Sequence, residues 1–489
     1  NSSINASHSV TDSSSQQIAV SGNNVDTIYL EEGDLYYDNN SSGFVGTRIK
    51  QNNDTASFPE IAVSGTDKYL VWLQNDSLLY NNTSVPASAK KLITGVSSSD
   101  TSNMLAVSGS NVHIVFSQGG VLNYINSTGN FANAASPVTI HADDFNENQQ
   151  LAVSGSTLHV VWQNSNGVYY KNNTNNFASP VLQLGTGSIP QLAVSGSDVH
   201  FVWKQNGITP QIKYASLVAN ALSSPITLSD SSNVSTNPKI ATGGGNVYAV
   251  WQEKIGTNNE IFFASSANGF TPINLSNDLG ASTEPQIAVS GANVFVTWKD
   301  SSFNLAIYER SSSDGGNTFG SFTVLSDIAN FATNPKLAIS GTDVSYSWLE
   351  NISGPNDVFV RTGQSNANFV AFDKEEYILS DNPVVTYTIP SKAGDGTSSD
   401  TIPVTISSTS DDAGISVTLT ESGNTGVFTG TFLLDTGLSD DALDKIKTAS
   451  GSLIFASHLT GSASSHIAPI TVTLVEDGIS TDNFDFGSI

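Results

Sequence analysis

The sequence predicts an all-β chain built mainly from one repeated unit of about 45 residues. Eight related five-residue segments, most of them reading LAVSG or IAVSG, begin at Ile18, Ile61, Leu105, Leu151, Leu192, Ile240, Ile287 and Leu337. Eleven positions after each start stands an aromatic residue: Tyr29, Trp72, Phe116, Trp162, Trp203, Trp251, Trp298 and Trp348. Four short strands in a recurring unit of this length are typical of a β-propeller blade.

The strands of one unit follow from its residue types. The glycine of the start segment predicts a tight turn between the first and second strands. The second strand is β-branched and contains the recurring aromatic residue. Third apolar segments lie at 35–37, 78–80, 168–170, 212–214, 261–263, 306–308 and 358–360, and fourth segments at 137–140, 225–228, 272–275 and 322–325.

Eight copies predict an eight-bladed propeller, with seven blades and an irregular unit as the alternative. Residues 3–17 resemble the fourth strand and linker at 224–239. We therefore expect the N-terminal strand to complete the last blade and leave no open edge. The recurring aromatic residue is expected to fill the space between neighbouring blades.

The repeat ends and the residue composition changes after residue 365. We therefore predict a propeller at 1–365, an Ig-like β-sandwich at 366–476 and a polar tail at 477–489. Short alternating strands are expected at 369–389, 400–409, 415–422, 426–434, 451–459 and 468–476, with a helical turn at 443–449. Residues 366–489 contain 4 Lys and 17 Asp or Glu, a balance of 4 − 17 = −13, which is half of the net charge of −26.

The composition excludes several classes of partner. With 18 Lys and Arg against 44 Asp and Glu, the chain is a poor ligand for nucleic acid. It has no Cys, so neither disulfides nor thiol chemistry are expected. No apolar run is long enough to span a bilayer. The polar opening at Asn1 predicts a mature, secreted or cell-surface chain.

The segment SSDGGNTF at 312–319 resembles the Asp-box of sialidase-like propellers, with Ser312, Asp314, Gly316, Thr318 and Phe319 in place. In that family the Asp-box is a structural turn, and three arginines bind the substrate carboxylate. This chain has only Arg48, Arg310 and Arg361, at positions that do not suit such a clamp. We therefore expect no catalytic residues and no enzyme activity.

Other candidate chemistry is sparse. His113, His159 and His200 stand eight residues after successive repeat starts, where other copies have Tyr69, Tyr248 and Phe295. We interpret this position as a structural one that accepts aromatic rings, because one His per blade is too widely spaced for a shared metal ion. A hydrolase would need carboxylates that converge at the central channel.

The run at 400–434, and Leu419 to Phe432 above all, resembles Ig-like repeats of archaeal surface-layer and cell-surface proteins. That resemblance implies that Ca²⁺ stabilises the domain, although no cofactor is required. The candidate ligands are Asp373, Asp381, Asp395, Asp400, Asp411 and Asp412, with Asp435 nearby. A solvated acidic face is the alternative.

Sequons for N-glycosylation are confined to the first 351 residues. The candidate positions are Asn40, Asn53, Asn75, Asn82, Asn126, Asn172, Asn233, Asn274 and Asn351.

These observations lead to an expected function. The first hypothesis is a non-enzymatic extracellular structural protein that self-associates into a surface layer, sheath or filament. The alternative is a secreted carbohydrate-binding or adhesion module that recognises glycans, and a glycoside hydrolase is the third.

Overall fold

The computed structural model describes residues 3–7, 11–44, 47–49, 54–83, 89–97, 103–128, 131, 136–142, 147–277, 280–301, 305–320, 322–327, 330–341, 343–351, 354–364, 369–372, 376–377, 382–388, 400–408, 411–421, 427–435, 437–448, 452–457 and 468–472. These residues form β-strands with a few 3₁₀ turns and no α-helix. The contacts divide the chain into two compact units. The larger unit comprises Ser3–Thr318 and Leu325–Gly363, and the smaller contains Phe319–Val324 and the residues from Gln364 onward.

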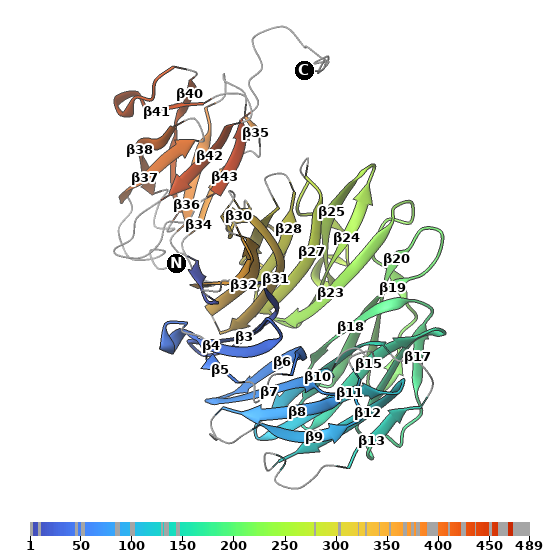
Figure 1. The fold of residues 1–489 in the computed structure, drawn as a ribbon. Coiled ribbons are helices and arrows are strands. Elements are labelled where there is room, and N and C mark those ends of the chain that lie inside the picture. The colour runs from blue at the N-terminus through green and yellow to red at the C-terminus, as the bar shows by residue number, and fades with distance from the viewer. Residues whose placement is uncertain are drawn as a thin grey trace, which may run out of the picture. The chain divides into compact units, whose positions relative to one another are not determined.

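The larger unit is a succession of antiparallel sheets, which we number one to eight in chain order (Figure 1). Sheets one to four are β2(Ser13–Ser21), β3(Asn24–Glu31), β4(Asp34–Asn39), β5(Thr47–Arg48); β6(Ala56–Ser64), β7(Asp67–Gln74), β8(Ser77–Asn82), β9(Lys90–Thr94); β10(Asn103–Ser108), β11(Asn111–Gln118), β12(Val121–Ser127), β13(Val138–His141); and β14(Glu147–Ser154), β15(Thr157–Asn164), β16(Gly167–Asn172), β17(Leu182–Gly185).

Sheets five to seven are β18(Ser188–Ser195), β19(Asp198–Gln205), β20(Gln211–Val218), β21(Ala221–Leu222) with β22(Ile226–Thr227); β23(Ser235–Gly243), β24(Asn246–Ile255), β25(Asn258–Ser265), β26(Ile273–Asn274); and β27(Ser282–Ser290), β28(Asn293–Asp300), β29(Ala306–Ser312), β30(Thr323–Val324). Sheet eight is β31(Phe331–Ser340), β32(Asp343–Asn351), β33(Asn356–Gln364) and β1(Ile4–Asn5).

The N-terminal strand closes the ring, as the sequence predicts. β1 pairs antiparallel with β33, with Ile4 opposite Val360. The first strand of each sheet contacts the first strand of the next, and the series closes where β31 meets β2. These eight first strands therefore surround a common axis, and we call them the inner strands. The prediction of a β-propeller fold is confirmed for this unit.

The recurring aromatic residues fill the spaces between sheets. Trp72 of sheet two is fully buried against Ile28 and Leu35 of sheet one. Tyr29 of sheet one packs in the same way against Val358 of sheet eight, across the closure. All six tryptophans of the chain lie in this unit and are at most 1% exposed. Their burial supplies much of the apolar contact between sheets.

The start segment is repeated because it links sheets as well as turning the chain. Its glycine, for example Gly155, has a φ of +58°, and the seven equivalent glycines lie between +56° and +61°. The serine before the turn reaches the next sheet: Ser108 Oγ donates to the Gly155 carbonyl at 2.8 Å, and Ser340 Oγ accepts from Gly22 N at 2.9 Å. The predicted tight turn is therefore confirmed.

The smaller unit is also built from β-strands. Its main sheet has the order β34-β36-β39-β38-β37-β42-β43-β35, and β40 pairs with β41. The strands are β34(Phe369–Phe372), β35(Glu376–Tyr377), β36(Val384–Thr388), β37(Thr401–Ser408), β38(Asp411–Glu421), β39(Val427–Thr431), β40(Leu433–Asp435), β41(Lys445–Lys447), β42(Ser452–Ser457) and β43(Ala468–Val472). The expected helical turn at 443–449 is wrong. A 3₁₀ turn occupies Asp441–Leu443 instead, where the Asp440 side chain accepts from Ala442 N, and β41 follows it.

Candidate functional site

The inner strands of the larger unit share a bulge near the end at which they begin. Three residues before the repeat start, the backbone enters the left-handed region at Ser15, Phe58, Asn148, Ile189, Asn237, Glu284 and Asn334, with φ between +48° and +59°. The pairing register with the second strand shifts at the same place in each of these seven sheets, as between Ser57 and Glu60. A bulge of this kind redirects the side chains that follow it.

The residue just before each repeat start is partly exposed in all eight sheets. In chain order these residues are Gln17, Glu60, Met104, Gln150, Gln191, Lys239, Gln286 and Lys336. Because the inner strands surround one axis, the eight positions form a ring, which we call the axial ring. The ring is mainly polar, and its three ionisable members are Glu60, Lys239 and Lys336.

A cavity of about 150 Å³ opens beside the axial ring. It is formed by the inner strands β31, β2 and β6, and its walls include Gln16, Gln17, Phe58, Glu60, Asn334 and Lys336. The Phe58 side chain is 37% exposed there, which is unusual for a phenylalanine. Its neighbours are amide, carboxyl and ammonium groups, a combination typical of small-molecule sites.

Glu60 and Lys336 are the charged walls of this cavity. Burial raises the pKa of Glu60 to about 7, and the positive charge of Lys336 opposes that rise. Burial lowers the pKa of Lys336, while Glu60 and Glu284 act to raise it. An acid and a base whose pKa values both move toward neutrality suit proton transfer near pH 7.

Glu284, at the bulge of sheet seven, is already engaged. Its carboxylate forms an ion pair with Lys299 and accepts a hydrogen bond from Asn334 N at 2.8 Å. Glu284 therefore helps to fix the bulge of sheet eight, and Glu60 is the carboxyl group of the cavity itself.

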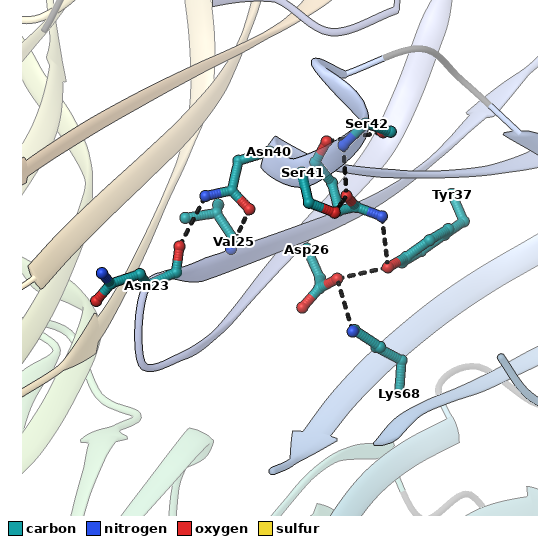
Figure 2. Close-up of polar contacts among 9 residues, drawn as sticks. Asn23, Val25, Asp26, Tyr37, Asn40, Ser41, Ser42 and Lys68 are labelled. Atoms are coloured by element: carbon teal, nitrogen blue, oxygen red, sulfur yellow. Dashed lines mark hydrogen bonds and ion pairs between the residues drawn. The ribbon is translucent and has the colours of Figure 1, made fainter. Parts of the chain in front are cut away.

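A second polar cluster lies between sheets one and two, around Asp26 (Figure 2). Asp26 is fully buried, accepts a hydrogen bond from the Tyr37 hydroxyl at 2.5 Å, and lies 3.9 Å from Lys68 Nζ of β7. Burial raises the pKa of Asp26, although Tyr37 and Lys68 oppose the rise. The Asn40 side chain stabilises the neighbouring turn through two hydrogen bonds. Its Nδ2 donates to the Asn23 carbonyl, and its Oδ1 accepts from Val25 N. The ion pair between Asp26 of β3 and Lys68 of β7 therefore joins sheets one and two.

The same position in sheets three to five holds the histidines. His113 bonds Tyr124 at 2.8 Å, His159 bonds Tyr170 at 2.7 Å, and His200 bonds Tyr214 at 2.9 Å, each between Nδ1 and the hydroxyl. All three histidines are at most 9% exposed. Burial lowers the pKa of each, to about 4 for His159. The three His–Tyr pairs are structural, in agreement with the interpretation of this position from the sequence.

The segment at 312–319 forms a turn organised by Asp314. Its carboxylate accepts from Thr318 N at 3.0 Å and Thr318 Oγ1 at 2.6 Å, and Ser312 Oγ donates to it at 2.7 Å. Burial acts to raise the pKa of Asp314, but the hydrogen bonds outweigh it and lower the pKa overall. None of these residues lines the cavity.

The three arginines belong to three different sheets, one, seven and eight. Arg48 pairs with Asp34 at 2.5 Å in sheet one, and Arg361 Nη1 donates to the Leu325 carbonyl at 3.4 Å. Arg310 and Arg361 lie within the third strands β29 and β33 rather than after them. No arginine lines the cavity.

The proposed calcium ligands are described only in part. Asp373, Asp381 and Asp395 lie outside the described residues, and of Asp412 only the backbone, in β38, is described. Asp411 accepts from Gly414 N at 3.4 Å and from Ser439, and Asp435 pairs with Lys445 at 2.8 Å. Asp400 precedes β37 and is partly exposed. Within the described part of the chain, no group of three or more acidic or His side chains could hold a metal ion.

The sequons differ in exposure. Asn40, Asn75 and Asn126 are exposed, Asn172, Asn233, Asn274 and Asn351 are partly exposed, and Asn82 is buried. Asn53 lies outside the described residues. Where the structure describes helices, none is long and apolar enough to cross a membrane.

Comparisons with known proteins address the fold. No family model and no curated protein matches the chain. Similar solved structures include a polysaccharide lyase, ulvan lyase bound to -[GlcA(1-4)Rha3S]- (9% identity, 74% of this chain and 96% of that chain, TM-score 0.45). Others are the β-propeller domain of the Trilobed protease from Pyrococcus furiosus (9%, 64% and 99%, TM-score 0.40) and a prolyl endopeptidase (9%, 80% and 56%, TM-score 0.42).

These likenesses concern the fold alone, but they correct one expectation. The sequence predicts that the chain is not an enzyme. That expectation is contradicted, because the ulvan lyases, a second polysaccharide lyase and the prolyl endopeptidase are all enzymes. The predicted structural role in a surface layer, sheath or filament finds no support in these comparisons.

Sequence reasoning missed Phe58, Glu60, Lys239 and Lys336. One signal was present: the position before each repeat start holds Gln, Glu, Lys or Met. A position that is polar in seven of eight copies, directly before an apolar strand segment, indicates a surface shared by all the sheets.

Proposed function

We propose that the larger unit binds a saccharide in the cavity beside the axial ring. The observation that carries this proposal is the exposed Phe58 ring in a cavity whose other walls are amide, carboxyl and ammonium groups. An aromatic face packs against the C–H face of a sugar ring. Planar amides and a carboxyl group exchange hydrogen bonds with its hydroxyls.

The backbone at Phe58 supports a functional role for its side chain. Its φ of +49° is unfavourable for a bulky residue, and equivalent bulges use Asn148, Asn237 and Asn334, which tolerate it better. A strained residue of this kind costs on the order of 1–3 kcal/mol and is concentrated at binding and catalytic sites. Phe58 shares this conformation with Ile189 and Glu284 of other sheets, but of these three residues it alone lines the cavity.

The same cavity holds the groups that a catalytic step on a bound sugar requires. Burial raises the pKa of Glu60 to about 7, so its carboxyl group can gain and lose a proton near neutral pH. Lys336 lines the same cavity and supplies a positive charge beside that carboxyl group. A carboxyl group that exchanges a proton near neutral pH can act as a general acid or base, and the ammonium group can hold a negatively charged group of the sugar.

Several finer expectations also remain proposals. We infer that the eight sheets are the eight blades of one propeller with a sialidase-like Asp-box at Ser312 to Phe319, and that the C-terminal unit is Ig-like. We retain the domain bounds at 365 and 476, secretion to the cell surface, glycosylation at exposed sequons, Ca²⁺ in the C-terminal unit and self-association. Glycans are the proposed ligands, and nucleic acid is not expected.

Binding to a panel of neutral and acidic polysaccharides, by glycan array and affinity electrophoresis, tests the proposal. Phe58→Asn removes the ring and suits the left-handed backbone, so the variant is expected to fold and to lose binding at least tenfold. Phe331→Ala is the matched control, because Phe331 is 55% exposed at the start of β31 and does not line the cavity. Equal binding by both variants, or binding to no polysaccharide, would overturn the proposal.

A further inference from the structure

Two lysines of the axial ring stand on inner strands that are separated by a single strand. Lys239 belongs to β23 and Lys336 to β31, at the same register position, with Gln286 of β27 between them. The charge of Lys336 acts on Lys239, so the two ammonium groups lie within electrostatic reach of each other. Lys336 also lines the cavity beside Phe58.

Neither lysine has a carboxylate at ion-pair distance. Among the described residues, neither forms an ion pair within 4.0 Å, and carboxyl groups act on Lys336 only from farther away. The acidic groups that face Lys336 are Glu60 and Glu284, and Glu284 is paired with Lys299. Burial, and secondarily Lys336, lowers the pKa of Lys239 to about 8.

Two neighbouring, partly desolvated ammonium groups repel each other, and the arrangement is unfavourable unless an anion neutralises it. The chain as a whole has a net charge of −26 and only 18 Lys and Arg. Two uncompensated lysines at the axis therefore give this site a charge opposite in sign to that of the molecule, which favours an anionic ligand there.

We propose that Lys239 and Lys336 form an oxyanion subsite that binds the carboxylate or sulfate group of an acidic sugar while Phe58 contacts the sugar ring. Gln286, between the lysines, is placed to donate an amide hydrogen bond to the same group. This inference rests on the proposed function for the sugar, and on the lysine pair for the acid group.

The surroundings of the subsite predict how its affinity depends on pH. An anion binds when both lysines are protonated, and Lys239 loses its proton as the pH rises through about 8. Glu60, when ionised above about pH 7, competes with the anion for Lys336. Glu284, although it is paired with Lys299, also favours the protonated form of Lys336. Affinity for an acidic sugar is therefore expected to fall between pH 6.5 and 8.5.

Calorimetric titrations of the full chain with sodium glucuronate, sodium sulfate and glucose, at constant ionic strength in NaCl, test the inference. Lys239→Gln and Lys336→Gln are expected to weaken glucuronate and sulfate binding at least tenfold and to leave glucose binding unchanged. Lys336→Arg, which keeps the charge, is expected to restore most of the affinity. Lys254→Gln is the control, because Lys254 is exposed at the end of β24.

The outcomes separate the two proposals. Glucuronate that binds no better than glucose, with no effect of the lysine variants, overturns the oxyanion subsite and leaves saccharide binding intact. Sulfate binding that depends on the lysines, with no binding of either sugar, supports the subsite and overturns the saccharide proposal. Thermal unfolding of each variant checks that a loss of binding is not a loss of fold.

Discussion

Gln16 and Asn334 join the first and last sheets of the ring through two hydrogen bonds. Gln16 Nε2 donates to the Asn334 carbonyl at 2.5 Å, and Asn334 Nδ2 donates to Gln16 Oε1 at 3.1 Å. Gln16 is fully buried, whereas other inner strands have a buried proline at its position, such as Pro59 and Pro285. The side-chain amide therefore belongs to the closure, which lies beside the cavity.

Removing this amide is expected to destabilise the larger unit. Gln16→Ala removes the partner of the Asn334 carbonyl and of its side-chain amide, which are partly buried, and is expected to cost about 1–3 kcal/mol. All six tryptophans lie in the larger unit, so urea unfolding followed by tryptophan fluorescence reports on it alone. Gln191→Ala, in the axial ring away from the closure, is expected to change stability by less than about 0.5 kcal/mol. Equal effects of the two substitutions would contradict this role.

The repeat explains which parts of the fold could be predicted. Gly155 and its equivalents, and aromatic residues such as Trp162, recur at fixed spacing because each sheet meets the same turn and packing requirements. The closing N-terminal strand was predictable for the same reason, since residues 3–17 resemble a fourth strand. The sequence repeat therefore predicts the local structure of each sheet and the order of the sheets along the chain.

The candidate site was not predictable in this way. The bulge that directs Glu60 and Lys336 toward the axis occurs at positions occupied by Ser, Phe, Asn, Ile and Glu, which share no turn signature. The cavity brings together strands β2, β6 and β31, and the last of these is about 270 residues from Phe58 in sequence. Convergence over that separation depends on ring closure and has no local sequence signal.

The His159–Tyr170 pair predicts an acid-dependent loss of stability. The unfolded chain protonates His159 below about pH 6.5, whereas the folded chain does so only near pH 4. Between these values the unfolded state binds more protons, so stability falls as the pH falls. His159→Phe, which copies Phe295 of sheet seven, is expected to cost about 1 kcal/mol at pH 7.5 through the lost hydrogen bond.

Below pH 6.5 the order of stability should change. The variant lacks the protonation penalty, which reaches about 2–3 kcal/mol in the parent chain by pH 4.5. Urea midpoints measured from pH 7.5 to 4.5 for both chains test this. Parallel pH profiles would show that burial does not keep His159 neutral.

The repeated turn glycine predicts a difference between two substitutions at one position. Gly155 has a φ of +58°, and a Cβ added there meets nothing within 4 Å, so only backbone strain opposes a side chain. Gly155→Ala is expected to cost about 1–2 kcal/mol, and Gly155→Asn less, because asparagine tolerates this conformation. Thermal and urea unfolding of both variants measure the difference. A similar cost for Ala and Asn would indicate that something other than φ is limiting.

The raised pKa of Glu60 predicts that the folded chain loses stability as the pH rises, whereas His159 makes it lose stability as the pH falls. Its pKa is about 7 in the folded chain against an ordinary value of 4.5. Between these values the folded state binds more protons than the unfolded state, so the parent chain loses stability as the pH rises from 4.5 to 7. Glu60→Gln removes that loss, and the variant is expected to be more stable than the parent by about 1–3 kcal/mol at pH 8 and nearly equal at pH 5.

Urea unfolding of the two chains at pH 5 and pH 8, followed by tryptophan fluorescence, measures this difference. Glu147→Gln serves as the control, because Glu147 is exposed at the start of the inner strand β14. A Glu60→Gln variant whose stability differs from the parent by the same amount at both pH values would mean that Glu60 is ionised throughout this range. In that case Lys336, and not burial, would set its charge, and Glu60 would not hold the proton that an acid–base step at neutral pH requires.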